Sequence, residues 1–169
     1  SFVVGLEGHV NYQMVTSLLY SKTGDLYVAN SESINNILLK LDSNNNWTEI
    51  DKFNPTEGNE NLKFMSIDSE NKLWIYSDYW NHTAVYSYDL STDKLTEYSN
   101  FVNEDGAIIS NVERCYSLAE DHEGNIWVGL NQGLFVLTEE YKKDPTKGFY
   151  QVKVPRNDGT NYADYLLSG

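Results

Sequence analysis

A short pattern, a turn followed by a strand with an aromatic residue near its centre, occurs three times in this chain. The three copies are Gly24–Val28, Asn71–Ile75 and Gly124–Val128. Their aromatic residues, Tyr27, Trp74 and Trp127, are 47 and 53 positions apart. One hairpin cannot bury its apolar faces alone, and four short strands in each period of roughly 40–50 residues are typical of propeller blades. We therefore predict an all-β fold of about three four-stranded β-propeller blades, with partial blades at the ends; a meander or sandwich with chance similarity is the alternative.

The composition agrees with a packed β protein. Of the 169 residues, 40% are hydrophobic and 14% aromatic, and thirteen Tyr and four Trp stand against only three Pro. Aromatic residues favour strands over helices. We find no apolar run long enough to span a bilayer and no signal peptide.

The repeat divides the chain into successive units. We predict a blade remnant at 1–13, blade one at 14–53, blade two at 62–101, blade three at 112–154 and a connecting tail at 155–169. The inner strands should lie near 16–21, 63–68 and 116–121. Because propellers typically have four to eight blades, we expect this chain to be a fragment of a larger propeller, or copies of it to associate.

The third copy carries the clearest motif. Its residues Glu120–Leu137, EDHEGNIWVGLNQGLFVL, closely resemble the two-component regulator propeller repeat: an acidic residue, a Gly-containing turn, a strand ending in Gly and a Gly-Leu hairpin. The second copy, Ser66–Asp89, keeps Asp68 and Leu73-Trp74-Ile75 but has Tyr76 where the pattern has Gly. The first copy keeps only the turn and strand at Thr23–Val28.

This resemblance implies a function. Such repeats form the periplasmic sensor region of membrane two-component regulators, commonly hybrid histidine kinases, and many relatives sense breakdown products of polysaccharides. The resemblance thus implies a non-catalytic, periplasmic, ligand-sensing segment, with any kinase outside this chain. Two alternatives stay open: a streptogramin-lyase type of propeller enzyme, which needs catalytic His and acidic residues gathered on one face, and a protein-interaction scaffold.

The charge and the motifs exclude several other functions. A formal net charge of −13 disfavours nucleic acid and anionic membranes as partners. Phosphate-binding, nucleophile-elbow, zinc and paired-cysteine motifs are absent, so we expect no cofactor and no metal. Asp42–Asn46 has the oxygen spacing of a calcium loop but lacks its central Gly and closing Glu, which favours a polar hairpin. The single cysteine, Cys115, is interpreted as a buried small hydrophobic residue.

Other repeated positions have structural interpretations. We expect Asp68 and Asp121 to accept hydrogen bonds from the backbone N–H groups of their turns. Tyr27, Trp74 and Trp127 share one register and should share one packing layer between blades.

The most unusual stretch is Ser77–Thr83, in which adjacent aromatic residues are flanked by Asp, Asn and His. In this topology the loops between second and third strands share one face with the connections between blades. The predicted ligand-binding residues on that face are Asp78, Tyr79, Trp80, Asn81, His82, Asn111 and Arg114. Aromatic faces with amide and carboxylate partners suit a neutral or weakly charged oligosaccharide; the alternative is that Tyr79 or Trp80 packs over the neighbouring blade.

Overall fold

The computed structural model describes residues 14–31, 38–53, 62–79 and 82–165, and these residues are almost wholly β. Blade one contains β1 (Met14–Tyr20), β2 (Leu26–Ser31), β3 (Leu38–Leu41) and β4 (Trp47–Glu49). Blade two contains β5 (Leu62–Ile67), β6 (Lys72–Tyr79), β7 (His82–Asp89) and β8 (Lys94–Tyr98). Blade three contains β10 (Cys115–Glu120), β11 (Ile126–Leu130), β12 (Gly133–Leu137) and β13 (Phe149–Gln151). The helical elements of the described residues are the 3-10 turns η1 (Asp51–Phe53) and η2 (Tyr141–Lys143).

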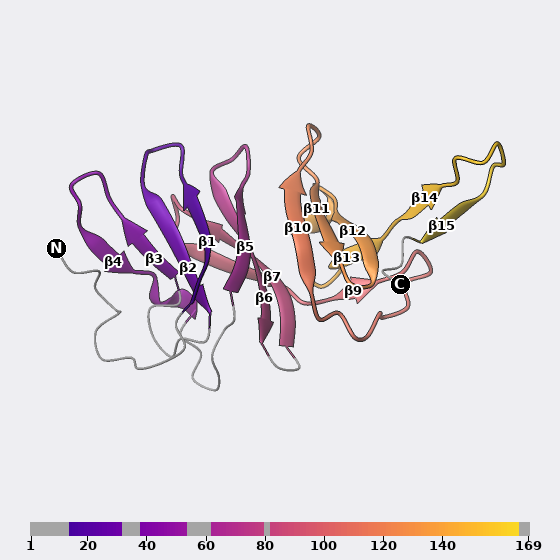
Figure 1. The fold of residues 1–169 in the computed structure, drawn as a ribbon, viewed down its shortest axis with the longest axis horizontal. Coiled ribbons are helices and arrows are strands. Elements are labelled where there is room, and N and C mark those ends of the chain that lie inside the picture. Colours follow the sequence, from indigo (N-terminus) through magenta and orange to yellow (C-terminus); the bar gives the residue numbers. More distant parts are fainter. Residues whose placement is uncertain (1–13, 32–37, 54–61, 80–81, 166–169) are drawn as a thin grey trace.

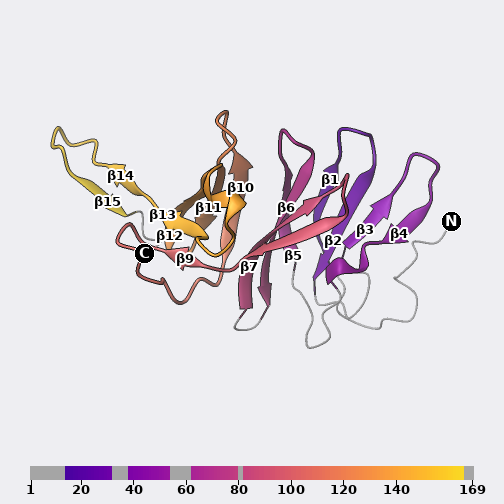
Figure 2. The ribbon, with the colours of Figure 1, turned by 180° about the vertical axis from the view of Figure 1, so that it is seen from behind.

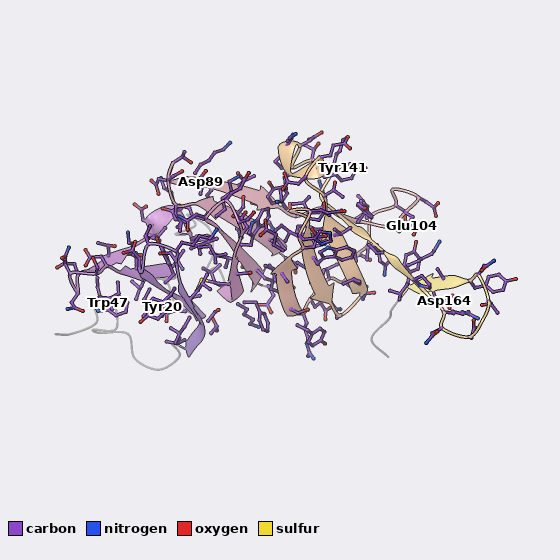
Figure 3. The ribbon with its side chains drawn as sticks, turned by 90° about the horizontal axis from the view of Figure 1, so that it is seen from above. Tyr20, Trp47, Asp89, Glu104, Tyr141 and Asp164 are labelled. Atoms are coloured by element: carbon purple, nitrogen blue, oxygen red, sulfur yellow. The ribbon has the colours of Figure 1, made fainter. Side chains whose placement is uncertain are left out.

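The three sheets follow one another in chain order, with blade two in the middle (Figure 1). Each blade is an antiparallel meander whose first strand is innermost, and β5 contacts both β1 and β10. Seen from above, Tyr20 of β1 lies on the opposite side of the row of blades from Asp89, which ends β7, and from Tyr141 of η2 (Figure 3). The all-β propeller architecture is confirmed, and the inner strands begin and end within two residues of their predicted positions.

A fifth strand, which the repeat did not predict, joins blade three. Phe101–Val102 form β9, placed by the sequence at the boundary between blade two and its connection, and this strand pairs in parallel with β13. The chain therefore crosses the outer edge of blade three before it returns inward to β10 (Figure 2). The residues after β13 form a separate hairpin of β14 (Lys153–Pro155) and β15 (Ala163–Tyr165), which extends beyond blade three (Figure 1).

The core consists of two layers, each between neighbouring blades. Tyr27 belongs to the layer between blades one and two, where Phe53 packs edge-on against Tyr86 at a centroid distance of 5.4 Å. Trp74 belongs to the layer between blades two and three and lies 5.5 Å from the ring of Tyr98. Alternate residues of β6 and β7 supply the two layers, as the period of a strand requires.

Aspartates close the turns between inner and second strands, as the sequence predicts. Asp68 Oδ1 accepts backbone N–H groups at 2.9 and 2.8 Å, and its Oδ2 accepts the indole N–H of Trp74 at 2.8 Å. Asp121 does the same in blade three. Its Oδ1 accepts two backbone N–H groups of its turn, and its Oδ2 accepts the indole N–H of Trp127 at 2.7 Å. Burial favours the neutral form of Asp121, but these hydrogen bonds outweigh it and lower its pKa to about 2. The indole donor explains why Trp recurs at this position of the strand.

No helix in the described part of the chain is long and apolar enough to cross a membrane. The predicted blade remnant at 1–13 lies outside the described residues.

Candidate ligand cavity between blades two and three

A cavity of about 520 Å³ lies between blades two and three, beside the connection that joins them. We call it the interblade cavity; it is lined by Asp78, Thr83, Ser99, Phe101, Ile109, Asn111, Val112 and Glu113. Its volume falls within the range of small-molecule sites. Two of the residues predicted from the sequence, Asp78 and Asn111, thus line one cavity although they are 33 positions apart.

Blade two supplies one wall through the facing ends of β6 and β7. Asp78 and Thr83 are cross-strand partners there. Lys63 Nζ donates to Asp78 Oδ2 at 2.6 Å, and the Asp78 side chain is only 9% exposed. Thr83 Oγ1 donates to the carbonyl of Val112 at 2.6 Å, which connects this wall to the opposite one. The ion pair neutralises the carboxylate, so this wall presents polar atoms with little net charge.

The connection before β10 supplies the opposite wall. Asn111 has a φ of +62°, in the left-handed region, and its carbonyl accepts the side-chain amides of Asn131 at 2.8 Å and Gln132 at 3.2 Å. Asn131 Oδ1 in turn accepts the backbone N–H groups of Glu113 at 2.9 Å and Arg114 at 3.2 Å. The β11–β12 turn therefore holds this wall through its own side chains, and the side chain of Asn111 stays exposed.

The other predicted site residues are placed differently. His82 is exposed, and its Nε2 lies 3.2 Å from Oε1 of Glu97. Arg114 is exposed, and its carbonyl accepts the backbone N–H of Asn131; it is not part of the cavity lining. Tyr79 ends β6, while Trp80 and Asn81 lie outside the described residues. Their roles in binding stay predictions.

Sequence reasoning missed the apolar part of the lining. Phe101 and Ile109 come from the segment that forms β9 and its following turn, where Ile109 N donates to the carbonyl of Phe101 at 2.8 Å. This segment has no counterpart in the repeat pattern, and a strand of two residues gives no periodic signal. The available signal was the short apolar run Ala107-Ile108-Ile109 in a connection that is otherwise mostly polar.

A second cavity, of about 410 Å³, lies at the outer edge of blade three. Its lining includes Glu104 and Tyr141, which are labelled in Figure 3, and Tyr150, whose ring centroid is 5.9 Å from that of Tyr141. Among the residues that the structure describes, none of the predicted site residues lines it.

The described residues offer little for metal or thiol chemistry. Among them, no three His, Cys, Asp or Glu side chains lie close enough to hold a metal ion. Cys115 is buried, as predicted, and burial raises the pKa of its thiol to about 12. A thiol with such a pKa is a poor nucleophile at neutral pH.

The residues that form the cavity wall before β10 lie in a stretch that matches a known sequence family. The two component regulator propeller family matches residues 110–132, which include Asn111, Val112 and Glu113. The resemblance seen in the third repeat is therefore confirmed over this stretch. A comparison with curated proteins found no match.

Solved structures share the fold at low sequence identity. PorZ, a surface component of the type-IX secretion system of Porphyromonas gingivalis, superposes over 90% of the chain with a TM-score of 0.69 and 18% identity. The extracellular domain of a putative hybrid two component system, BT4673 from B. thetaiotaomicron, covers 99% with a TM-score of 0.56 and 18% identity. The virginiamycin B lyase of Staphylococcus aureus covers 75% with a TM-score of 0.56 and 14% identity. The chain spans 22%, 18% and 38% of these proteins, respectively.

Proposed function

We propose that this chain is a non-catalytic, periplasmic segment of a sensor propeller that binds a neutral oligosaccharide in the interblade cavity. The observation that carries the proposal is the cavity itself, because it brings Asp78 together with Asn111 of the family-matched stretch. The similarity to the extracellular domain of a putative hybrid two component system supports a sensor in particular. A histidine kinase acting on the signal would lie outside the described residues.

The chemistry of the lining favours a neutral, polar ligand with an apolar face. Phe101, Ile109 and Val112 supply apolar surface, while Thr83, Ser99 and Asn111 supply hydroxyl and amide groups. The carboxylate of Asp78 is neutralised by Lys63, and the whole chain carries a net charge of −13, so a polyanion would be repelled. A neutral sugar ring matches both requirements, with hydroxyls for the polar groups and C–H faces for the apolar ones.

A ligand in this position would bridge two blades. One wall belongs to the sheet of blade two and the other to the connection that leads into blade three, and the Thr83 to Val112 hydrogen bond joins them. A ligand that contacts both walls binds more tightly to the arrangement of blades in which the two walls face each other than to any other arrangement. This difference in affinity shifts the conformational equilibrium toward that arrangement. As partners in that arrangement we propose further propeller blades, from the same polypeptide or a second copy. Sedimentation of a concentrated sample tests this part; a stable monomer would count against it.

The lyase alternative needs histidine and acidic residues gathered on one face. The two histidines within the described residues lie at opposite ends of their blades (Figure 1). His82 is the first residue of β7, next to the β6–β7 turn, whereas His122 lies in the β10–β11 turn. This separation favours binding over lyase chemistry. Incubation with a streptogramin B antibiotic tests the alternative, and ring opening would support the lyase.

The binding proposal is tested by calorimetric titration with a panel of neutral oligosaccharides such as maltotriose, xylotriose and cellotriose. The informative variant is Asn111→Gly, because glycine accepts the φ of +62° and keeps the carbonyl that holds the wall. Losing a side chain that makes one or two hydrogen bonds should weaken binding about 5- to 30-fold. Asn45→Gly is the matched control, since Asn45 has the same φ but lies in the β3–β4 turn of blade one. Equal affinities of the two variants would refute the site, and a lack of binding to any sugar would favour the scaffold.

A further inference from the structure

The second cavity, at the outer edge of blade three, is separate from the interblade cavity. Among the described residues, none lines both cavities. Strand β9 lies between them, because Phe101 lines the interblade cavity and the next residue, Val102, lines the second one. Successive side chains of a strand point to opposite sides, so this short strand contributes to both. The volume of the second cavity, about 410 Å³, suits a small molecule.

Three segments that are far apart in the sequence build the second cavity. Asn103 closes the turn after β9, since its Oδ1 accepts the backbone N–H of Ala107 at 2.9 Å. Thr138 fixes the start of η2, because its Oγ1 accepts the backbone N–H of Tyr141 at 3.3 Å. Tyr150 belongs to β13, which is paired on both sides. Hydrogen bonds within the protein therefore hold all three walls in place.

Two tyrosine rings line the second cavity at a steep angle to each other. The ring centroids of Tyr141 and Tyr150 are 5.9 Å apart, and the ring planes meet at 69°. Such a pair surrounds a compact group from two sides, whereas one flat ring offers only a stacking platform. The ring of Tyr141 already has a cation beside it, because Lys147 Nζ lies 4.8 Å from its centroid. Aromatic faces attract ammonium groups electrostatically, so this ring is suited to a cation.

The charged side chains of the lining are both acidic. Glu104 lies in the turn after β9, whereas Glu140 immediately precedes Tyr141 of η2, so two walls each supply one carboxylate (Figure 3). Lys153 forms an ion pair with Glu104 at 2.8 Å, but among the described residues no lysine or arginine lines the cavity. Glu140 is exposed and makes no side-chain capping hydrogen bond to η2. The chain's net charge of −13 adds a field that attracts cations.

We propose that the second cavity binds an organic ammonium ion, which contacts the rings of Tyr141 and Tyr150 while Glu104 and Glu140 balance its charge. This site does not depend on the proposed function, because it takes a cation in a different cavity. A quaternary ammonium spreads its charge over methyl groups, so it gains from aromatic faces and nearby carboxylates without needing direct hydrogen bonds. Two sources share this chemistry: a free small molecule such as choline, and a lysine side chain of a partner protein.

Titration of the isotope-labelled chain at low ionic strength, followed through backbone amide chemical shifts, tests the inference. Choline should cause saturating changes at Glu104, Tyr141 and Tyr150. Its uncharged isostere, 3,3-dimethyl-1-butanol, should bind about fivefold more weakly or worse, because it lacks the cation–π and ionic attraction. Nα-acetyl-lysine amide distinguishes the sources: tighter binding than choline indicates a lysine side chain, and weaker binding indicates a free quaternary ammonium.

Glu140→Gln removes one carboxylate and keeps the shape of the side chain. It should weaken choline binding about two- to fivefold and leave the affinity for the uncharged isostere unchanged. Glu123→Gln is the matched control, since Glu123 is exposed in the β10–β11 turn and the same charge is lost away from the cavity. Lys147→Met should strengthen choline binding, because it removes the ammonium group that lies over Tyr141.

Three results would overturn the inference. The first is equal binding of choline and its uncharged isostere. The second is a lack of saturating changes at the second cavity with both choline and the lysine derivative. The third is an equal effect of Glu140→Gln and Glu123→Gln on choline affinity.

Discussion

The buried turn aspartate of blade two offers a quantitative test of how the blades are held together. In Asp68→Asn, the amide oxygen can still accept the two backbone N–H groups of the turn at the position of Oδ1. The amide nitrogen, however, replaces the oxygen that accepts the indole N–H of Trp74 at 2.8 Å. A hydrogen bond to a charged group contributes about 1.5–3 kcal/mol, and Trp74 is only 1% exposed, so water cannot replace the acceptor. We expect Asp68→Asn to reduce the free energy of unfolding by about 2–3 kcal/mol.

The matched control is Asp121→Asn in blade three, where the same bond joins Asp121 to Trp127 at 2.7 Å but the indole is half-buried. Water can reach this donor, so the loss should be less than half as large. Urea unfolding followed by far-UV circular dichroism measures both. A second test adds Trp74→Phe, which removes the donor, and the change at Asp68 should then cost clearly less than in the wild type. Equal losses in the two blades, or no coupling between Asp68 and Trp74, would refute the reasoning.

Three further predictions follow from single groups. The folded-state pKa of Asp121, about 2, lies below the value of about 3.9 for an unfolded aspartate. The carboxylate therefore contributes its full stability above about pH 4, and this contribution is lost as the pH falls from about 4 to 2. The urea midpoint of Asp121→Asn should consequently fall less steeply over this pH range than that of the wild type. Cys115, whose pKa is about 12, should not react with a thiol reagent at pH 8 until the protein is unfolded, and rapid labelling of the native chain would contradict its burial. Gly148→Ala should destabilise by about 2 kcal/mol or more, because φ is +67° and the new Cβ would lie 2.1 Å from the Asn100 carbonyl oxygen; Gly159→Ala, at φ +80° with open space around it, should cost only about 1 kcal/mol in the same urea assay.

The parts of the fold that recur in the sequence were predictable from it. The inner strands and the Asp68 and Asp121 turns repeat with the same residue types, because each blade must meet its neighbour in the same way. Elements that occur once were not predictable. The parallel strand β9 is two residues long, and β14 pairs with β15 rather than with blade three. Such short pairings depend on tertiary contacts that leave no period in the sequence.

The candidate site could be predicted in part for the same reason. The repeat topology predicts that Asp78 and Asn111 lie on one face, and the two residues line one cavity. Phe101 and Ile109 belong to a connection that does not repeat, so nothing in the sequence indicated that they would complete the lining. Tyr76 was recognisable as a departure from the repeat. Its complete burial, however, results from packing between two blades and could not be inferred from one strand.

The central claim is that a neutral saccharide binds in the interblade cavity. The most direct measurement is a map of backbone amide chemical shifts of the isotope-labelled chain during titration with the best-binding sugar. The account predicts that the largest changes cluster at Asp78, Thr83, Asn111 and Glu113, from both walls of the cavity. Saturating changes confined to the second cavity, around Glu104 and Tyr141, or no saturating change with any sugar, would contradict it.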